Sequence, residues 1–104
     1  MPQTDDMMDT LRVALETDSV NDMLVTLLTV AENRFVDGNK AQSFAIVALL
    51  REYPMPEVLA AQVEMLFDEL EFQLCPRVVA DAKARALEIT LEEIVLEVLN
   101  ESAR

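Results

Sequence analysis

The chain has 104 residues, of which 52% are hydrophobic and 27% charged. This balance predicts one globular domain spanning residues 1–104. It has 20 acidic and 8 basic residues, a net charge of −12, no His, one Cys and one Gly. These counts exclude a zinc cluster, a histidine acid–base site, an internal disulfide and a glycine-rich phosphate loop. The charge also argues against direct binding to nucleic acid, which needs a basic patch.

We expect this chain to carry no targeting or membrane segment. Residues Met1–Asp6 lack the basic start and the continuous apolar run of a signal peptide. The longest uncharged apolar run, Phe44–Leu50, is far shorter than the roughly 18 residues that indicate a membrane span. We therefore expect a cytoplasmic protein with no membrane partner.

Apolar residues recur at helical spacing along the chain, and no two segments offer strands that could pair. The sequence therefore predicts an all-α fold of about six antiparallel helices, as helical-hairpin repeats or a compact bundle. The predicted helices span about residues 5–16, 19–36, 40–53, 56–74, 75–87 and 90–104. They group into an N-terminal helix (1–17), a first hairpin (19–53), a second hairpin (56–88) and a capping helix (90–104).

The first hairpin has a clear turn signal. Gly38 is the only glycine and lies where a helix end favours a left-handed residue. A turn at Gly38 places two small residues, Ala31 and Ser43, where the two helices must approach each other closely. We therefore expect these two residues to lie at the contact between the helices.

The later helices also carry boundary signals. Pro54 and Pro56 break the chain before the helix predicted at 56–74. Thr90 and Glu93 form the pattern of a capping box, in which each side chain accepts from the backbone amide of the other residue. The sequence therefore predicts a sharp helix start at Thr90.

The helix predicted at 56–74 has two opposed apolar faces. One face carries Leu59, Val63, Leu66, Phe67, Leu70 and Leu74, and the other carries Val58, Ala61, Met65 and Phe72. Such a helix is either covered on both sides or carries an interface on one of them. The second face is therefore interpreted either as cover for a neighbouring helix or as a surface for a protein partner or a second copy.

Methionine is frequent in this chain, with six residues. Its flexible thioether suits adaptable interfaces, although it also fills gaps in small cores. The candidate interface residues are Met7, Met8, Leu11, Val58, Met65 and Phe72.

No set of residues converges in a pattern typical of catalysis. Acidic neighbours such as Glu92 and Glu93 point about 100° apart on a helix. Glu93 and Glu97 share a face, but two carboxylates alone make a weak metal site. Cys75 precedes a proline at a helix boundary, and the chain has no His to activate it. We therefore expect no catalytic residue, no metal, no cofactor and no enzymatic activity.

A family pattern is carried by residues 30–38, 43–51, 54–57 and 70–75 and, most specifically, by 78–86 running into 89–95. Through these residues, the stretch from about Val20 to Asn100 resembles the C-terminal end of the tetratricopeptide-like region in large bacterial signal-transduction ATPases and LuxR-type (MalT-like) regulators. Glycine is common in that family at the places of Ala48, Cys75 and Ala86, where this chain departs. The resemblance implies a helical-repeat docking segment without an ATPase module or a DNA-reading motif.

The leading hypothesis is a non-enzymatic helical-repeat module for protein–protein interaction in bacterial signalling or transcriptional regulation. We expect it to form a homodimer, because a repeat array with fewer than about three repeats leaves apolar faces open. One alternative is an acidic mimic of nucleic acid that occupies a DNA-binding protein. Another is a sensor of hydrophobic small molecules, which a large enclosed cavity would favour.

Overall fold

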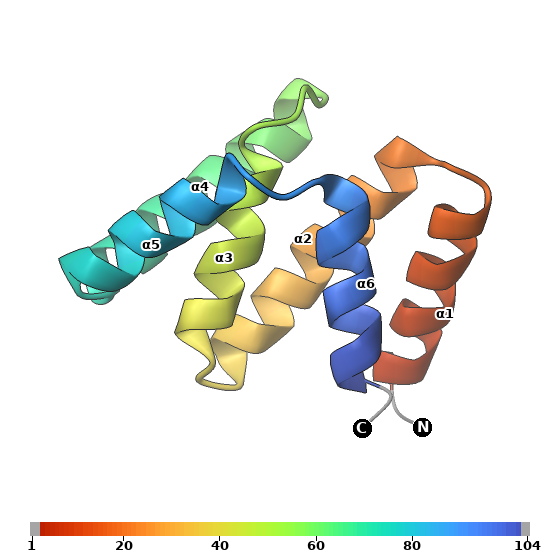
Figure 1. The fold of residues 1–104 in the computed structure, drawn as a ribbon, viewed down its shortest axis with the longest axis horizontal. Coiled ribbons are helices and arrows are strands. Elements are labelled where there is room, and N and C mark those ends of the chain that lie inside the picture. The colour runs from red at the N-terminus through yellow and green to blue at the C-terminus, as the bar shows by residue number, and fades with distance from the viewer. Residues whose placement is uncertain (1–2, 103–104) are drawn as a thin grey trace.

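The computed structural model describes the backbone of residues 3–102 and the side chains of residues 9–100. It confirms the all-α prediction: the described chain consists of helices joined by short turns, with no strand (Figure 1). The helices are α1 (Gln3–Glu16), α2 (Val20–Val36), α3 (Lys40–Leu50), α4 (Glu57–Gln73), α5 (Pro76–Ala86) and α6 (Leu91–Ser102).

The predicted boundary signals act as expected. Gly38 adopts φ +91° between α2 and α3. At the start of α6, the Glu93 amide donates to Thr90 Oγ1 at 3.2 Å, and the Thr90 amide donates to Glu93 Oε1 at 2.8 Å. This capping box satisfies a helix-start amide that would otherwise lack a partner.

The helix α3 ends at Leu50, earlier than the predicted end near Tyr53. The chain leaves the helix through a turn in which the Tyr53 amide donates to the Leu50 carbonyl at 3.1 Å. Pro54 explains the early end, because a residue before proline disfavours helical geometry. The turn also places the Tyr53 hydroxyl where it accepts from the Leu91 amide at 2.8 Å, linking this connection to the start of α6.

The helix α3 is the centre of the core. It is apolar on nearly all sides, and α2, α4 and α5 pack against it. The Phe44 ring is fully buried and lies 4.9 Å, centroid to centroid, from the Phe67 ring of α4. Burial of the apolar faces around α3 is therefore the main force that holds α2, α4 and α5 together.

The prediction of close contact in the first hairpin is confirmed. Ser43 and Ala31 are both fully buried, and Ser43 Oγ donates to the Ala31 carbonyl at 2.6 Å. Small side chains allow α2 and α3 to approach, and the hydroxyl finds a backbone partner that offsets the cost of its burial.

The second hairpin is packed less closely than the first. The helices α4 and α5 follow each other and run in opposite directions (Figure 1), but each packs its backbone more closely against α3 than against the other. Long side chains bridge them instead: Lys83 Nζ on α5 lies 2.6 Å from Glu71 Oε2 on α4. The physical reason is that α3, which is apolar all round, needs cover on both of these sides.

The molecule closes as a bundle and does not extend as an open array. The first and last helices, α1 and α6, pack against each other, which an open repeat array does not allow (Figure 1). The Cα radius of gyration is 12.9 Å. A compact globule of this length has a radius of about 13 Å. Of the two architectures that the sequence left open, the structure is consistent with the compact bundle.

Substitutions at two turn residues with positive φ should have opposite effects on stability. Asp18, between α1 and α2, adopts φ +55°, which glycine tolerates better than other residues. We expect Asp18→Gly to raise the free energy of unfolding by about 0.5–1 kcal/mol and Gly38→Ala, at φ +91°, to lower it by about 1 kcal/mol. Urea denaturation followed by far-UV circular dichroism measures both. A loss of stability in Asp18→Gly would contradict the assigned turn geometry.

Candidate functional site

Three large apolar side chains lie exposed along one face of α4. Val58 and Met65 are each 74% exposed, and Phe72 is 88% exposed. They are seven residues apart, so they share one side of the helix and extend over about 21 Å. We call Val58, Met65 and Phe72 the α4 stripe.

The α4 stripe resolves the two interpretations of this face. The opposite face of α4 buries Val63, Phe67 and Leu70 in the core, as its apolar pattern predicts. The stripe itself covers no neighbouring helix, so the interpretation as cover is wrong. The other interpretation made from the sequence, a surface for a protein partner or a second copy, stays a prediction.

A groove lies beside the stripe, between α2 and α4. It has a volume of about 260 Å³. Its lining comprises Glu32 from α2 and Gln62, Met65, Leu66 and Glu69 from α4. Met65 therefore belongs both to the stripe and to the groove wall, and a chain that covered the stripe could also enter the groove.

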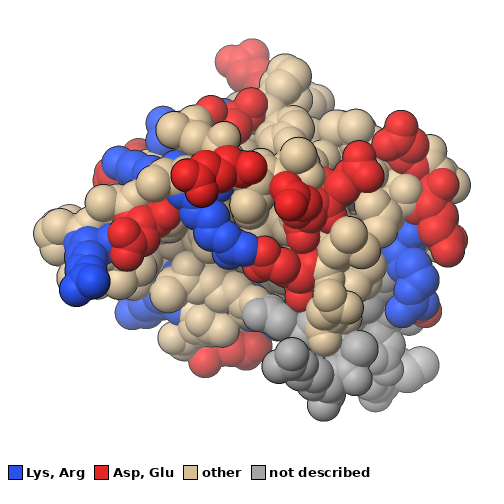
Figure 2. Space-filling view, in the orientation of Figure 1, with Lys and Arg blue, Asp and Glu red and all other residues tan. Residues whose placement is uncertain are grey.

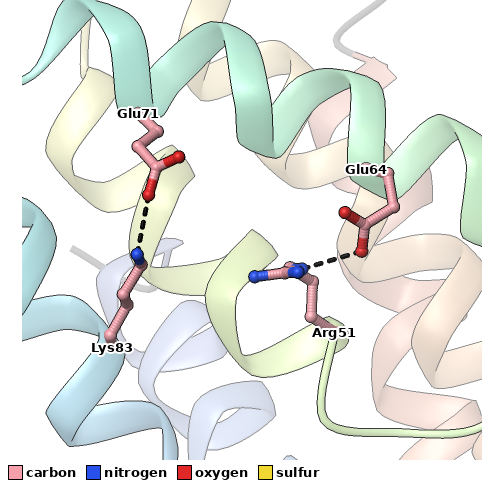
Figure 3. Close-up of polar contacts among 4 residues, drawn as sticks. All are labelled: Arg51, Glu64, Glu71 and Lys83. Atoms are coloured by element: carbon pink, nitrogen blue, oxygen red, sulfur yellow. Dashed lines mark hydrogen bonds and ion pairs between the residues drawn. The ribbon is translucent and has the colours of Figure 1, made fainter.

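The charges on α4 divide into a neutralised flank and an acidic rim. The helix contains five carboxylates and no basic residue. Figure 3 shows two of the carboxylates reached by basic side chains from other elements: Arg51 Nε lies 2.7 Å from Glu64 Oε2, and Lys83 reaches Glu71 in the ion pair already noted. Arg51 also lies over the Phe67 ring, 4.0 Å from its centroid, so this flank is fixed against the core.

The other three carboxylates of α4 surround the stripe. Within the described side chains, Glu57, Asp68 and Glu69 take part in no ion pair. At 100° per residue, Glu57 and Asp68 lie on one side of the stripe and Glu69 on the other. Glu32 adds a fourth carboxylate across the groove. We call Glu32, Glu57, Asp68 and Glu69 the acidic rim.

The face shown in Figure 2 has a different character. Acidic side chains spread across it, with basic side chains between them. Arg85 on α5 forms an ion pair with Glu97 on α6. The α4 stripe combines three large exposed apolar side chains with neighbouring carboxylates that form no ion pair among the described side chains.

The candidates on α1 do not join this site. Leu11 is fully buried in the core, so its assignment to an interface is wrong: α2 and α6 pack against α1 and cover that side of the helix. The side chains of Met7 and Met8 lie outside the described residues.

The side chains considered for chemistry have other roles or stand alone. Glu93 caps α6 and Glu97 pairs with Arg85, so the two do not form a joint site. Cys75 is exposed at the residue before α5, a helix boundary as predicted. Among the described residues, no three potential metal ligands come together, and no buried side-chain nitrogen or oxygen lacks a hydrogen-bond partner.

Two further crevices lie elsewhere on the surface. One, of about 280 Å³, is lined by residues that include Tyr53, Leu91 and Glu92; the other, of about 270 Å³, lies between α3, α5 and α6. Both are smaller than the roughly 300–1,000 Å³ typical of ligand pockets. They give no support to the alternative of a hydrophobic ligand sensor.

Sequence reasoning identified the stripe but missed the groove and its α2 wall. Glu32 gave no signal, because a helical period does not show that α2 will lie beside α4. The spacing of Val58, Met65 and Phe72 could be recognised because it repeats along a single helix.

Comparison with known proteins leaves the family open. No family model, no curated protein and no solved structure matches this chain. Among the described helices, none has both the length and the apolar character needed to cross a membrane.

Proposed function

We propose that this chain is a non-enzymatic protein–protein interaction module that binds its partner through the α4 stripe. The observation that carries the proposal is the exposure of Val58, Met65 and Phe72, at 74%, 74% and 88%, on one side of a helix whose other side is in the core. Covering these side chains removes apolar surface from water, at about 25 cal/mol per Å². The sequence resemblance favours a role for this module in bacterial signalling or transcriptional regulation.

The geometry supports docking of a macromolecule better than binding of a small molecule. The stripe is convex and extends over about four helical turns, a form that presents anchors to another chain. The neighbouring groove, at about 260 Å³, adds a recess next to Met65. Aromatic and Met side chains are enriched in protein interfaces.

A matched set of variants tests this function. Met65→Asp and Phe72→Asp place a charge on the stripe, and Leu87→Asp places one at the residue after α5, where the side chain is similarly exposed, at 73%. We expect the immobilised wild type and Leu87→Asp to retain the same protein from an extract of cells that express this chain. Both stripe variants should lose it. Mass spectrometry identifies the retained protein.

The chain alone is measured in parallel. Light scattering on a size-exclusion column, at two salt concentrations, gives its absolute mass and tests the homodimer predicted from sequence. Since the substituted side chains are exposed, the variants should keep wild-type stability within about 0.5 kcal/mol. A docking role for the stripe would be refuted by two results together: the wild type is a monomer, and the wild type and all three variants retain the same proteins.

A further inference from the structure

We infer that the occupant of the α4 stripe is a basic amphipathic helix of another protein, with Lys or Arg on both sides of its apolar anchors. This inference rests on the proposed function and narrows it to one class of partner. Both the spacing of the stripe and the distribution of charge around it support this inference.

The spacing of the stripe favours a helical partner that runs along α4. Side chains at seven-residue intervals drift by about 20° per interval on a straight helix. A second helix that crosses at about +20° keeps contact with such a row, as in coiled coils and helical bundles. Ala61, which is small and exposed between Val58 and Met65, allows this close approach. Anchors at i, i+3 or i+4, and i+7 of the partner would then meet the stripe.

The acidic rim specifies the charge of that partner. Glu57 and Asp68 lie on one side of the stripe, and Glu69 and Glu32 on the other. Two basic side chains form ion pairs with α4: Arg51 with Glu64 and Lys83 with Glu71, both on the neutralised flank (Figure 3). Among the described side chains, no cation forms an ion pair with a carboxylate of the acidic rim. A docked helix would therefore remove water from these carboxylates without supplying an opposite charge, unless the partner itself carries Lys or Arg there.

The same charges disfavour a second copy of this chain. The helix α4 has no Lys or Arg, so pairing two stripes would bring two acidic rims together without a basic side chain from either α4. Like charges at an interface carry an energetic penalty, and the chain carries a net charge of −12. The homodimer expected from the apolar pattern therefore conflicts with the electrostatics of the folded surface.

Synthetic helices test the inference directly. The probe is a peptide of about 18 residues with Leu at the anchor spacing and Lys elsewhere, long enough to span the stripe. A matched peptide replaces every Lys with Glu, and a third peptide keeps the Leu/Lys composition but scatters Leu around the helix. Isothermal titration calorimetry gives the Kd values, and amide NMR shifts of the ¹⁵N-labelled chain locate the site.

We expect the patterned Leu/Lys peptide to bind and to shift the amides around Met65 and Phe72, with weaker binding at higher salt. The two control peptides should bind at least about tenfold more weakly. Met65→Asp should raise the Kd of the patterned peptide by about tenfold or more, while Leu87→Asp should leave this Kd unchanged. The direction of the change in affinity separates the two explanations. Because each Asp makes the chain more acidic, a purely electrostatic attraction to the basic peptide would become stronger in Met65→Asp.

The other outcomes separate the inference from the proposed function. Equal binding of the Leu/Glu and Leu/Lys peptides at the stripe would overturn the inference that the partner is basic. The proposed docking function of the stripe would still stand. A dimer that Phe72→Asp converts to monomer would also overturn the inference, in favour of a second copy. Equal binding of the scattered peptide, or tighter binding by Met65→Asp, would reduce the interaction to charge alone. A monomer that binds none of the peptides would refute the inference, and with unchanged retention by the stripe variants it would refute the function too.

Discussion

Phe44→Ala should lower the free energy of unfolding by about 3–5 kcal/mol, the usual cost of removing a buried aromatic ring. Phe44 is fully buried at the centre of α3, and its ring is in contact with that of Phe67. Deleting it would leave a cavity where α3 meets α4, since close-packed surroundings relax only in part. A domain of this size has about 5–15 kcal/mol of stability, so a large part would be lost.

The matched control is Phe72→Ala, the same deletion at a ring that is 88% exposed. We expect it to change stability by no more than about 0.5 kcal/mol, because no packing is lost. Guanidinium denaturation of both variants, followed by far-UV circular dichroism, gives the comparison. A large cost at both positions would mean that Phe72 is packed in the folded chain, which would contradict the exposed stripe. A small cost at both would contradict the burial of Phe44 in the core.

Leu11→Ala should also lower the free energy of unfolding strongly, by about 2–5 kcal/mol. Leu11 is fully buried on α1, which packs against α2 and α6 and closes the bundle. Val13→Ala is the control, since Val13 lies on the same helix but is 55% exposed. Its cost should stay within about 0.5 kcal/mol.

Thermal and chemical denaturation of the two α1 variants test the closure of the bundle. If α1 were loosely attached, as a helix at the end of an open array would be, Leu11→Ala would cost little more than Val13→Ala. A large difference places α1 in the cooperative core and excludes Leu11 from an exposed interface.

Local chemistry made the helices predictable from sequence. Helix ends depend on nearby residues, so Gly38, Pro54 and the Thr90–Glu93 capping box set boundaries without reference to the rest of the fold. The contact of Ser43 with Ala31 was predictable for a similar reason: a short turn fixes how two successive helices meet.

The arrangement of helices that are distant in sequence was not predictable in this way. A helical period shows which side of a helix is apolar, but not which element covers it. The all-round apolar surface of α3 is covered by both α4 and α5, and these two helices therefore pack more closely on α3 than on each other. The apolar side of α1 that carries Leu11 was assigned to a partner for the same reason, whereas α2 and α6 cover it.

The candidate site was predictable only in part. The α4 stripe could be recognised, because Val58, Met65 and Phe72 repeat along one helix with a second apolar face opposite. The acidic rim could not, because its meaning depends on which carboxylates find basic partners. Arg51 and Lys83 come from other elements and neutralise Glu64 and Glu71 alone.

The contact between α1 and α6 has a consequence for how the bundle can be joined to other proteins. The two helices run antiparallel, so Gln3 at the start of α1 and Ser102 at the end of α6 lie at the same end of the molecule (Figure 1). A short linker could therefore connect them and produce a circular permutant with new ends at an exposed turn such as that of Gly38. For the same reason, the whole bundle could be inserted into a surface loop of a host protein without forcing the two sides of that loop far apart.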